Sequence, residues 1–244
     1  TVISQGALQI GNGGTTGSIQ GDVVDNGALI FNRSDVISFS GVISGTGSVV
    51  QAGIGTTQLT GTNTYSGGTN INNGILQIAT VDNLGTGGLS FGTANTGGTL
   101  LSTSSTDLTA AGNVVLNMGG GTIYTVNNTV SMTPTISGPG RLTKTGPCLL
   151  PLTGNNGYTG GPPVQPGTLA INSNNALGAD SGGLTLDNGT TLQLDADVAS
   201  ASRPITLTGG TATIDTLGNT GTFGGNIGGA GGLEKNGSGT LSLL

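Results

Sequence analysis

Short runs in which apolar and polar residues alternate recur along the chain, separated by Gly, Asn or Thr. The clearest of these runs are Ser48–Gln51, Thr57–Thr60, Thr69–Ile71, Ile75–Ile78, Leu89–Phe91 and Thr99–Leu101. Alternation with a period of two residues is typical of β-strands, whereas an amphipathic helix needs apolar residues three and four positions apart. No stretch has the helical spacing, and the helix formers Glu, Lys and Arg are scarce. We therefore predict an all-β chain with almost no helix.

The chain also repeats itself. Residues 45–78 and residues 138–171 align without a gap, and the first residues of the two stretches, Gly45 and Gly138, lie 93 positions apart. The positions that match are Gly61, Asn63, Tyr65, Gly67, Gly68, Gly74, Leu76 and Ile78 in the first copy and Gly154, Asn156, Tyr158, Gly160, Gly161, Gly167, Leu169 and Ile171 in the second. A third copy starts at Ile227, and Val2–Ile10 matches the tail of a fourth.

These repeats organise the chain as one segment, residues 1–244, with modules at about 1–10 (a tail only), 45–91, 138–186 and 223–244 (a start only). Because the chain enters one module late and leaves another early, we expect it to be a length of a longer protein. Self-similarity of this kind is typical of solenoids, in which each repeat stacks on its neighbours.

The interior of this solenoid must be narrow, because the chain has three Tyr, four Phe and no Trp. A β-sandwich usually draws on a bulkier core. A parallel β-helix needs only stacked rows of small aliphatic residues, with coils ~4.8 Å apart. The 93-residue shift divides into about four coils of 23 residues. We predict a right-handed parallel β-helix (β-solenoid) of about ten or eleven coils.

The repeated residues follow the pattern G-x-G-x-L-x-K-x-G-x-G-T-L-x-L-T-G-x-N-T-Y-S-G-G-T-x-I-x-x-G-T-L-Q-I. This pattern resembles the autotransporter-associated β-strand repeat of bacterial type V secretion, most closely at 61–69 and Gly74–Ile78. The resemblance covers over half the chain. It implies a passenger domain that is secreted or displayed on the bacterial cell surface, and a C-terminal outer-membrane β-barrel of the same precursor that is absent from these residues.

The same resemblance implies a non-enzymatic stalk, because the repeat carries no catalytic residues and is associated with assisting secretion of the passenger. The family includes adhesins, self-associating factors and a cytotoxin, so adhesion and virulence are the expected contexts. Two alternatives stay open: an adhesin or self-association module that binds host glycans, host proteins or neighbouring cells through its lateral face, and a polysaccharide-cleaving β-helix.

The second copy departs from the pattern at residues 147–166. Cys148 stands where the other copies have Gly, and Pro162, Pro163 and Pro166 fall within a strand and its turn. Proline cannot donate a hydrogen bond to a neighbouring strand, so these residues predict interrupted pairing, either a local bulge or an imperfection of the sequence.

Composition excludes several function classes. With no His, the chain has no His-based nucleophile and no His-ligated zinc or haem, and we expect no cofactor. Five basic residues against eleven acidic ones give a net charge of -6, which argues against a nucleic-acid partner. The single cysteine, Cys148, excludes an intramolecular disulfide.

The acidic candidates are few. Asp187, Asp195 and Asp197 form the one carboxylate cluster, and Asp195 and Asp197 would share a strand face roughly 6.6 Å apart, near the separation of an inverting glycosidase pair. A solvated strand end is the more ordinary interpretation of this cluster, and Arg203 is the single basic residue nearby. Calcium would need Asp22 with Asp25 or Asp180 with Asp187, without a known calcium-loop motif.

Two further residue types are candidates for binding. Tyr65 and Tyr158 occupy equivalent positions, where they would either close the interior at a corner or, if exposed, stack on sugars. Thr residues are frequent, as in ice-binding solenoids, but their irregular spacing in the sequence predicts no flat Thr-x-Thr array.

Overall fold

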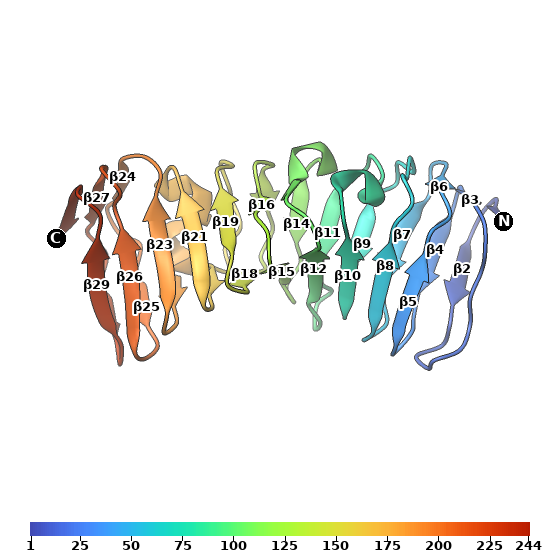
Figure 1. Cartoon of the computed structure of the whole chain (residues 1–244), viewed down its shortest axis with the longest axis horizontal. Helices are drawn as coiled ribbons and strands as arrows, with labels where there is room; N and C mark the ends of the chain where they lie inside the picture. Colours follow the sequence, from blue (N-terminus) through green and yellow to red (C-terminus); the bar gives the residue numbers. More distant parts are fainter.

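The computed structural model describes all residues, 1–244, and has the form of a rod in which strands stack side by side along the long axis (Figure 1). Every strand pair is parallel, and the chain winds through about 12 turns. The all-β solenoid expected from the sequence is therefore confirmed. Only four short 3-10 segments interrupt the strands: η1 (Val81–Leu84), η2 (Leu108–Ala111), η3 (Asn174–Leu177) and η4 (Asp180–Gly182). No helix in the structure has the length and apolarity needed to cross a membrane.

The longest sheet has ten strands, each contributed by a different turn: β5 (Val36–Phe39), β8 (Thr56–Leu59), β10 (Ile75–Ile78), β12 (Gly98–Ser102), β15 (Gly121–Thr125), β18 (Leu142–Thr145), β20 (Pro163–Val164), β22 (Leu184–Leu186), β25 (Ile205–Leu207) and β28 (Ile227–Gly229). A seven-stranded sheet contains β2 (Ala7–Ile10), β4 (Ala28–Phe31), β7 (Ser48–Gln51), β9 (Thr69–Ile71), β11 (Leu89–Phe91), β14 (Val114–Leu116) and β17 (Ile136–Ser137).

Four smaller sheets complete the turns. A five-stranded sheet contains β19 (Leu149–Leu152), β21 (Gly167–Ile171), β23 (Thr190–Leu194), β26 (Thr211–Asp215) and β29 (Gly232–Asn236). The others are β1 (Val2–Ile3) with β3 (Val23–Asp25) and β6 (Ile43–Ser44), β13 (Thr106–Asp107) with β16 (Val130–Ser131), and β24 (Val198–Ser200) with β27 (Thr220–Phe223) and β30 (Thr240–Leu243).

The turns are more numerous than the ten or eleven expected because many are shorter than 23 residues. In the ten-stranded sheet Val36 pairs with Thr56 and Thr56 with Ile75, which gives turns of 20 and 19 residues. Ile75 then pairs with Thr99, 24 residues later. The added or missing residues lie in the corners, so the paired strands stay in register.

The repeated module moves to a new sheet with each copy. Its Gly-x-Leu-x-Ile tail forms β2 in the seven-stranded sheet, β10 in the ten-stranded sheet and β21 in the five-stranded sheet. In the seven-stranded sheet, four whole turns lead from β7 to β17. The counterpart of β7 in the second copy is not β17 but the following strand, β18, which belongs to the ten-stranded sheet. The 93-residue repeat is therefore four turns and about a third of a turn, not four whole turns.

Figure 1 shows the consequence for the outside of the rod. On the half nearer the N-terminus the near side is formed by β5, β8 and β10, whereas on the other half it is formed by β21, β23, β26 and β29. The sheets therefore wind about the rod. The strands β10 and β21 form the tail of the module in its two complete copies, and both lie on the near side although they belong to different sheets. The additional third of a turn in each repeat therefore compensates for the winding of the sheets.

The repeated residues have the same roles in both complete copies. Asn63 accepts a hydrogen bond from the backbone N–H of Ile43 (2.8 Å) and donates to the carbonyl of Asn83, and so connects three successive turns. Asn156 does the same between Ile136 (2.8 Å) and Ala176. Both Asn side chains are buried, as are Leu76, Ile78, Leu169 and Ile171 in the core. Paired in this way, a buried amide costs little and fixes the stacking of the turns.

The glycines of the module lie where turns meet closely or the backbone turns. Gly61, Gly67, Gly154 and Gly160 pack on backbone atoms of the preceding turn, at distances that leave no room for a Cβ. Gly68, Gly74, Gly161 and Gly167 have positive φ, as left-handed corners require.

Both tyrosines point inward. Tyr65 and Tyr158 are fully buried, and a glycine of the following turn lies against each ring: a Cβ at Gly85 or Gly178 would come within about 3 Å of the ring carbons. The interior position is confirmed, and the exposed sugar-stacking ladder is excluded. Tyr65 exchanges a hydrogen bond with the Thr69 hydroxyl (2.7 Å), whereas the hydroxyl of Tyr158 has no partner.

Pro162 explains this difference, because it occupies the position that Thr69 has in the first copy. The Thr69 hydroxyl also donates to the Leu84 carbonyl (2.9 Å); in the second copy the equivalent carbonyl, Leu177, receives Arg203 instead (3.3 Å). The prolines shorten the pairing without ending it, since β20 has two residues and joins β18 through Lys144 and Val164 alone.

The two tyrosines provide a matched pair of variants. We expect Tyr65→Phe to lower the free energy of unfolding by about 1 kcal/mol, because it removes a buried hydrogen bond. Tyr158→Phe removes a buried hydroxyl that has no partner, so its stability should be unchanged or higher. Urea unfolding followed by circular dichroism measures both. Equal losses in the two variants would contradict this account of Pro162.

Candidate binding face

The outward side of the ten-stranded sheet carries a regular row of residues that are β-branched except for one proline. In strand register this outer row is Val36, Thr56, Ile75, Thr99, Thr122, Thr143, Pro163, Thr185 and Thr206. Neighbouring members lie on adjacent strands, so their spacing along the rod is ~4.8 Å. The five-stranded sheet has a similar row, in which Thr168, Thr191 and Thr213 are consecutive.

This row leaves standing the expectation drawn from the sequence, that no flat Thr-x-Thr array is present, but it shows an order that the spacing along the chain hides. The Thr residues are unevenly spaced along the chain because turns differ in length, but strand pairing brings them into line. The neighbouring outward row has a single Thr: it contains Ser38, Gln58, Gln77, Leu101, Tyr124 and Thr145. Gln58 donates to Gln77 across the strands (3.3 Å). A Thr-x-Thr double row, the arrangement that ice-binding solenoids need, is therefore absent.

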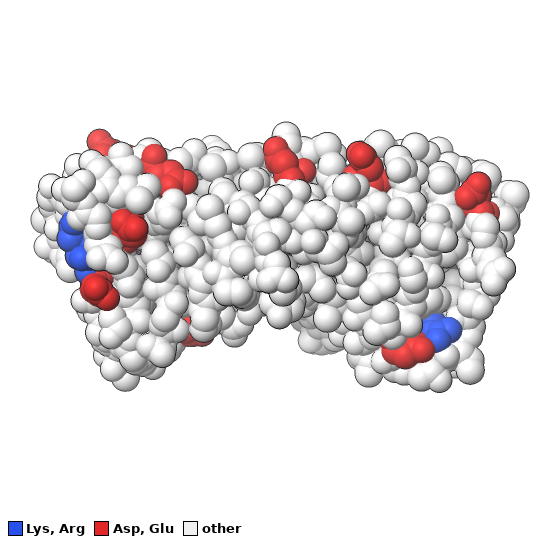
Figure 2. All heavy atoms as spheres, in the orientation of Figure 1, with Lys and Arg blue, Asp and Glu red and all other residues white.

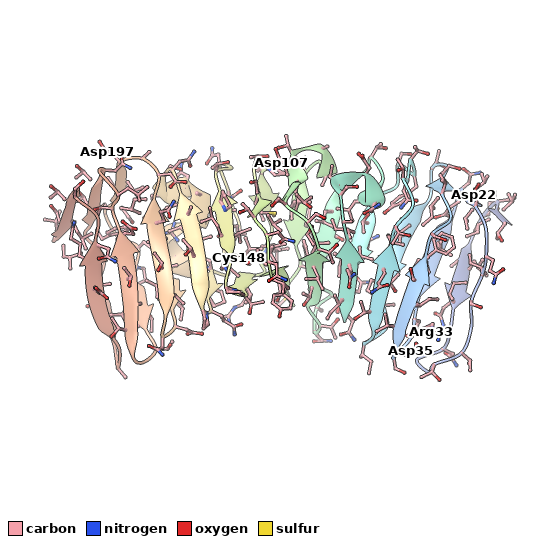
Figure 3. All side chains as sticks on the ribbon, in the orientation of Figure 1. Asp22, Arg33, Asp35, Asp107, Cys148 and Asp197 are labelled. Atoms are coloured by element: carbon pink, nitrogen blue, oxygen red, sulfur yellow. The ribbon has the colours of Figure 1, made fainter.

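No outward position of the ten-stranded sheet is charged. Figure 2 shows a near side without charged atoms over the middle of the rod, a set of carboxylates along the upper edge, and charged atoms of both signs near the two ends. Figure 3 labels Asp22, Asp107 and Asp197 on that edge. Beside the ten-stranded sheet the charges thus lie at the corners, and that sheet face offers hydroxyl, amide and methyl groups; the five-stranded sheet differs, with Asp215 on β26 and Glu234 and Lys235 on β29.

The acidic cluster is not a catalytic pair on one strand. Asp195 and Asp197 lie in the turn between β23 and β24, and both are exposed. Asp195 accepts from Gln193 (2.7 Å) and Asp197 from the backbone of Thr220 (2.7 Å), while Asp187 accepts from Thr208. The pairing of β21 with β23 ends at Ile171 and Leu194, so neither aspartate is part of the strand.

The surroundings of the cluster supply neither a groove nor a cation. The structure has two hollows, one between residues 19–21 and 38–41 and one between 101–103 and 126–128, and neither contains the cluster. Arg203 is fully buried and turned towards η3 and η4, where it donates to six groups of 174–183 and pairs with Asp180 (3.0 Å).

The aspartates considered for calcium each have other hydrogen-bond partners. Hydrogen bonds from Asn174 and Ser202, with the charge of Arg203, hold the pKa of Asp180 below its ordinary value. Asp22 accepts from the backbone of Val42 (2.8 Å). No group of three or more His, Cys, Asp or Glu side chains in the structure is arranged to hold a metal ion.

Asp25 and Lys144 are two buried charges that the sequence pattern did not reveal. Asp25 accepts from the backbone of Gly27 (2.9 Å) with one carboxylate oxygen, and the other has no partner. Burial raises the pKa of Asp25 and lowers that of Lys144 to about 8. Lys144 donates to Thr125 (3.2 Å) and to the carbonyl of Gly146, and near it the thiol of Cys148 donates to the carbonyl of Val126 (3.2 Å).

Parts of the chain are similar to known proteins. Residues 49–78, which run from β7 to the end of β10, match the family model of the passenger-associated transport repeat. Over 51 residues the chain is 55% identical to the adhesin BmaC autotransporter of Brucella suis biovar 1 (strain 1330). That stretch is 21% of this chain and 2% of the relative. No solved structure matches the chain.

The chain carries an autotransporter passenger repeat. The matched residues of this passenger repeat include Asn63 and Tyr65, the buried side chains that connect and fill successive turns. They also include Thr56 and Ile75 of the outer row. The passenger repeat therefore specifies both the inside of the solenoid and part of its outward face.

Asp25 gives a pH-dependent prediction. Because its pKa is higher in the folded chain than in the unfolded one, ionisation opposes folding, and stability falls as pH rises above about 4, the ordinary carboxyl pKa. We expect Asp25→Asn to raise the melting temperature at pH 7 and to have a smaller effect at pH 4. Asp82→Asn, at an exposed site in η1, is the control. An Asp25→Asn variant that is less stable at pH 7 would contradict the assignment.

Proposed function

We propose that the chain is a non-enzymatic stalk of a bacterial passenger that is secreted or displayed on the cell surface. Continuous parallel pairing through about 12 turns is the observation that supports this proposal. Each turn pairs with the next along one or more of its sides, so the rod is rigid and each completed turn is a template for pairing. A chain that folds in this way outside the outer membrane is hindered from sliding back, and folding assists secretion.

The mechanism is tested with the precursor that contains this segment. Phe31→Asp and Phe223→Asp place a charge in the core near the two ends, since both rings are fully buried. We expect at least one of these variants to reduce surface display, measured by protease accessibility on intact cells, because propagation from that end is blocked. Asn95→Asp, at an exposed corner, is the control. Normal export of both Phe variants would contradict folding-assisted secretion.

The lateral face supports a second candidate function, adhesion to glycans, to host proteins or to neighbouring cells. The relative is named an adhesin, and the outer row offers hydroxyl and methyl groups at a regular spacing without charge. Such a face suits neutral, hydroxyl-rich partners better than anionic ones, because it has no cation to hold an acidic polymer.

We expect Thr122→Lys with Thr143→Lys, both on the outer row, to reduce binding at least about tenfold without changing the melting temperature, because they introduce desolvated charge at the contact. Glycan arrays and a settling assay on displaying cells measure binding. Thr15→Lys with Asn95→Lys, away from the sheets, is the control pair. If the wild-type chain is negative in both assays, the stalk function alone is left.

A further inference from the structure

The ten-stranded sheet begins at β5 with an unpaired edge, although the chain has already completed a turn before it. Residues 18–20 occupy the third side of that first turn, but no hydrogen bond joins them to β5. Ile19 still packs against the core. The first turn is thus closed by side-chain packing while its backbone stands apart from the sheet.

The free groups on this edge are the backbone N–H and C=O of Val36 and Ser38. In a parallel strand successive residues direct these groups to opposite sides. The carbonyls of Asp35 and Phe39 accept from Thr56 and Thr60 on the β8 side (3.0 and 3.1 Å). Val36 and Ser38 therefore face the first turn, and neither makes a backbone hydrogen bond there.

An arginine holds the preceding segment away from this edge. Arg33 donates to the backbone carbonyls of Thr15 and Gly17 and binds both carboxylate oxygens of Asp35 (2.8 and 2.7 Å). Figure 3 shows Arg33 and Asp35 together at the lower edge of the rod, at the start of β5. This clamp fixes the course of the chain just before residues 18–20.

A hollow of about 420 Å³ lies between the first turn, at residues 19–21, and the end of β5 with the residues after it, 38–41. Its lining is largely Gly, Ser and Gln, with Ile19 and Phe39 as the hydrophobic members, and it contains no charged residue. Ser38 belongs to this lining and Val36 does not, so the free backbone groups of Ser38 face the hollow and those of Val36 lie beside it on the same strand edge. Backbone donors and acceptors at an open strand edge are the recognition groups of strand addition.

We propose that this edge binds an extended, uncharged peptide, which pairs with β5 as an additional strand in the hollow. The Val36 and Ser38 backbone groups supply the hydrogen bonds. The apolar position of the peptide lies opposite Phe39, and small polar residues lie outward. The occupant is a flexible segment, because a strand already built into a second rod cannot enter a gap between two turns. This site is independent of the stalk function.

The probe is a capped, labelled peptide with the sequence of residues 54–61, which supplies the strand that pairs with the other edge of β5. Binding to the 244-residue chain is measured by fluorescence polarisation. Ser38→Pro removes the edge N–H without touching the β8 side, and Ser38→Ala keeps it. We expect the wild-type chain and Ser38→Ala to bind equally and Ser38→Pro to bind at least about tenfold more weakly. No binding by the wild-type chain overturns the proposal.

Amide hydrogen exchange tests the same edge without a variant. In the free chain the amides of Val36 and Ser38 should exchange fast, while those of Ile37 and Phe39 are protected by β8. The peptide should slow Val36 and Ser38 selectively. Protection of Val36 and Ser38 in the free chain would show that residues 18–20 already pair with β5, and would overturn the proposal even if Ser38→Pro failed to fold.

Discussion

The structure depends on parallel backbone pairing between successive turns. The chain makes 131 backbone hydrogen bonds, and the named strand pairs are all between neighbouring turns. With so few bulky side chains, this ladder and not a deep core defines the path of the chain. The side chains that matter most are those that let turns approach to pairing distance, such as Gly85 and Gly178 against the tyrosine rings.

The ladder also explains why turns of unequal length form one regular object. A corner can gain or lose residues without disturbing the sheets, since only the strands must remain in register. The outward row of the ten-stranded sheet follows from this, because pairing aligns Thr99, Thr122 and Thr143 despite unequal spacing. A surface of this type can therefore persist while the sequence that encodes it drifts in length.

The sequence was sufficient to predict the strands, the solenoid and the inward tyrosines, because each depends on a local alternation or on the repeat. It was not sufficient for features that arise from pairing between turns. The Thr alignment needs the length of every corner, and the sheet-to-sheet step of the module needs the number of residues in every turn. The burial of Lys144 and Arg203 could not be predicted either, since it depends on carbonyls that approach from other turns, such as Gly146 and Gly178.

The second copy shows how such a fold tolerates a defect. Pro162 has no hydroxyl where the first copy has that of Thr69, and backbone pairing between turns does not supply this side-chain donor. Arg203, which lies two turns further along the chain, donates to the Leu177 carbonyl that the missing hydroxyl would have bound, and Asp180 balances its charge. The Tyr158 hydroxyl is the part of the defect that stays unrepaired. Because each turn touches only its neighbours, the cost of that orphan group is confined to one place, and the pairing resumes at β22 with three residues in register.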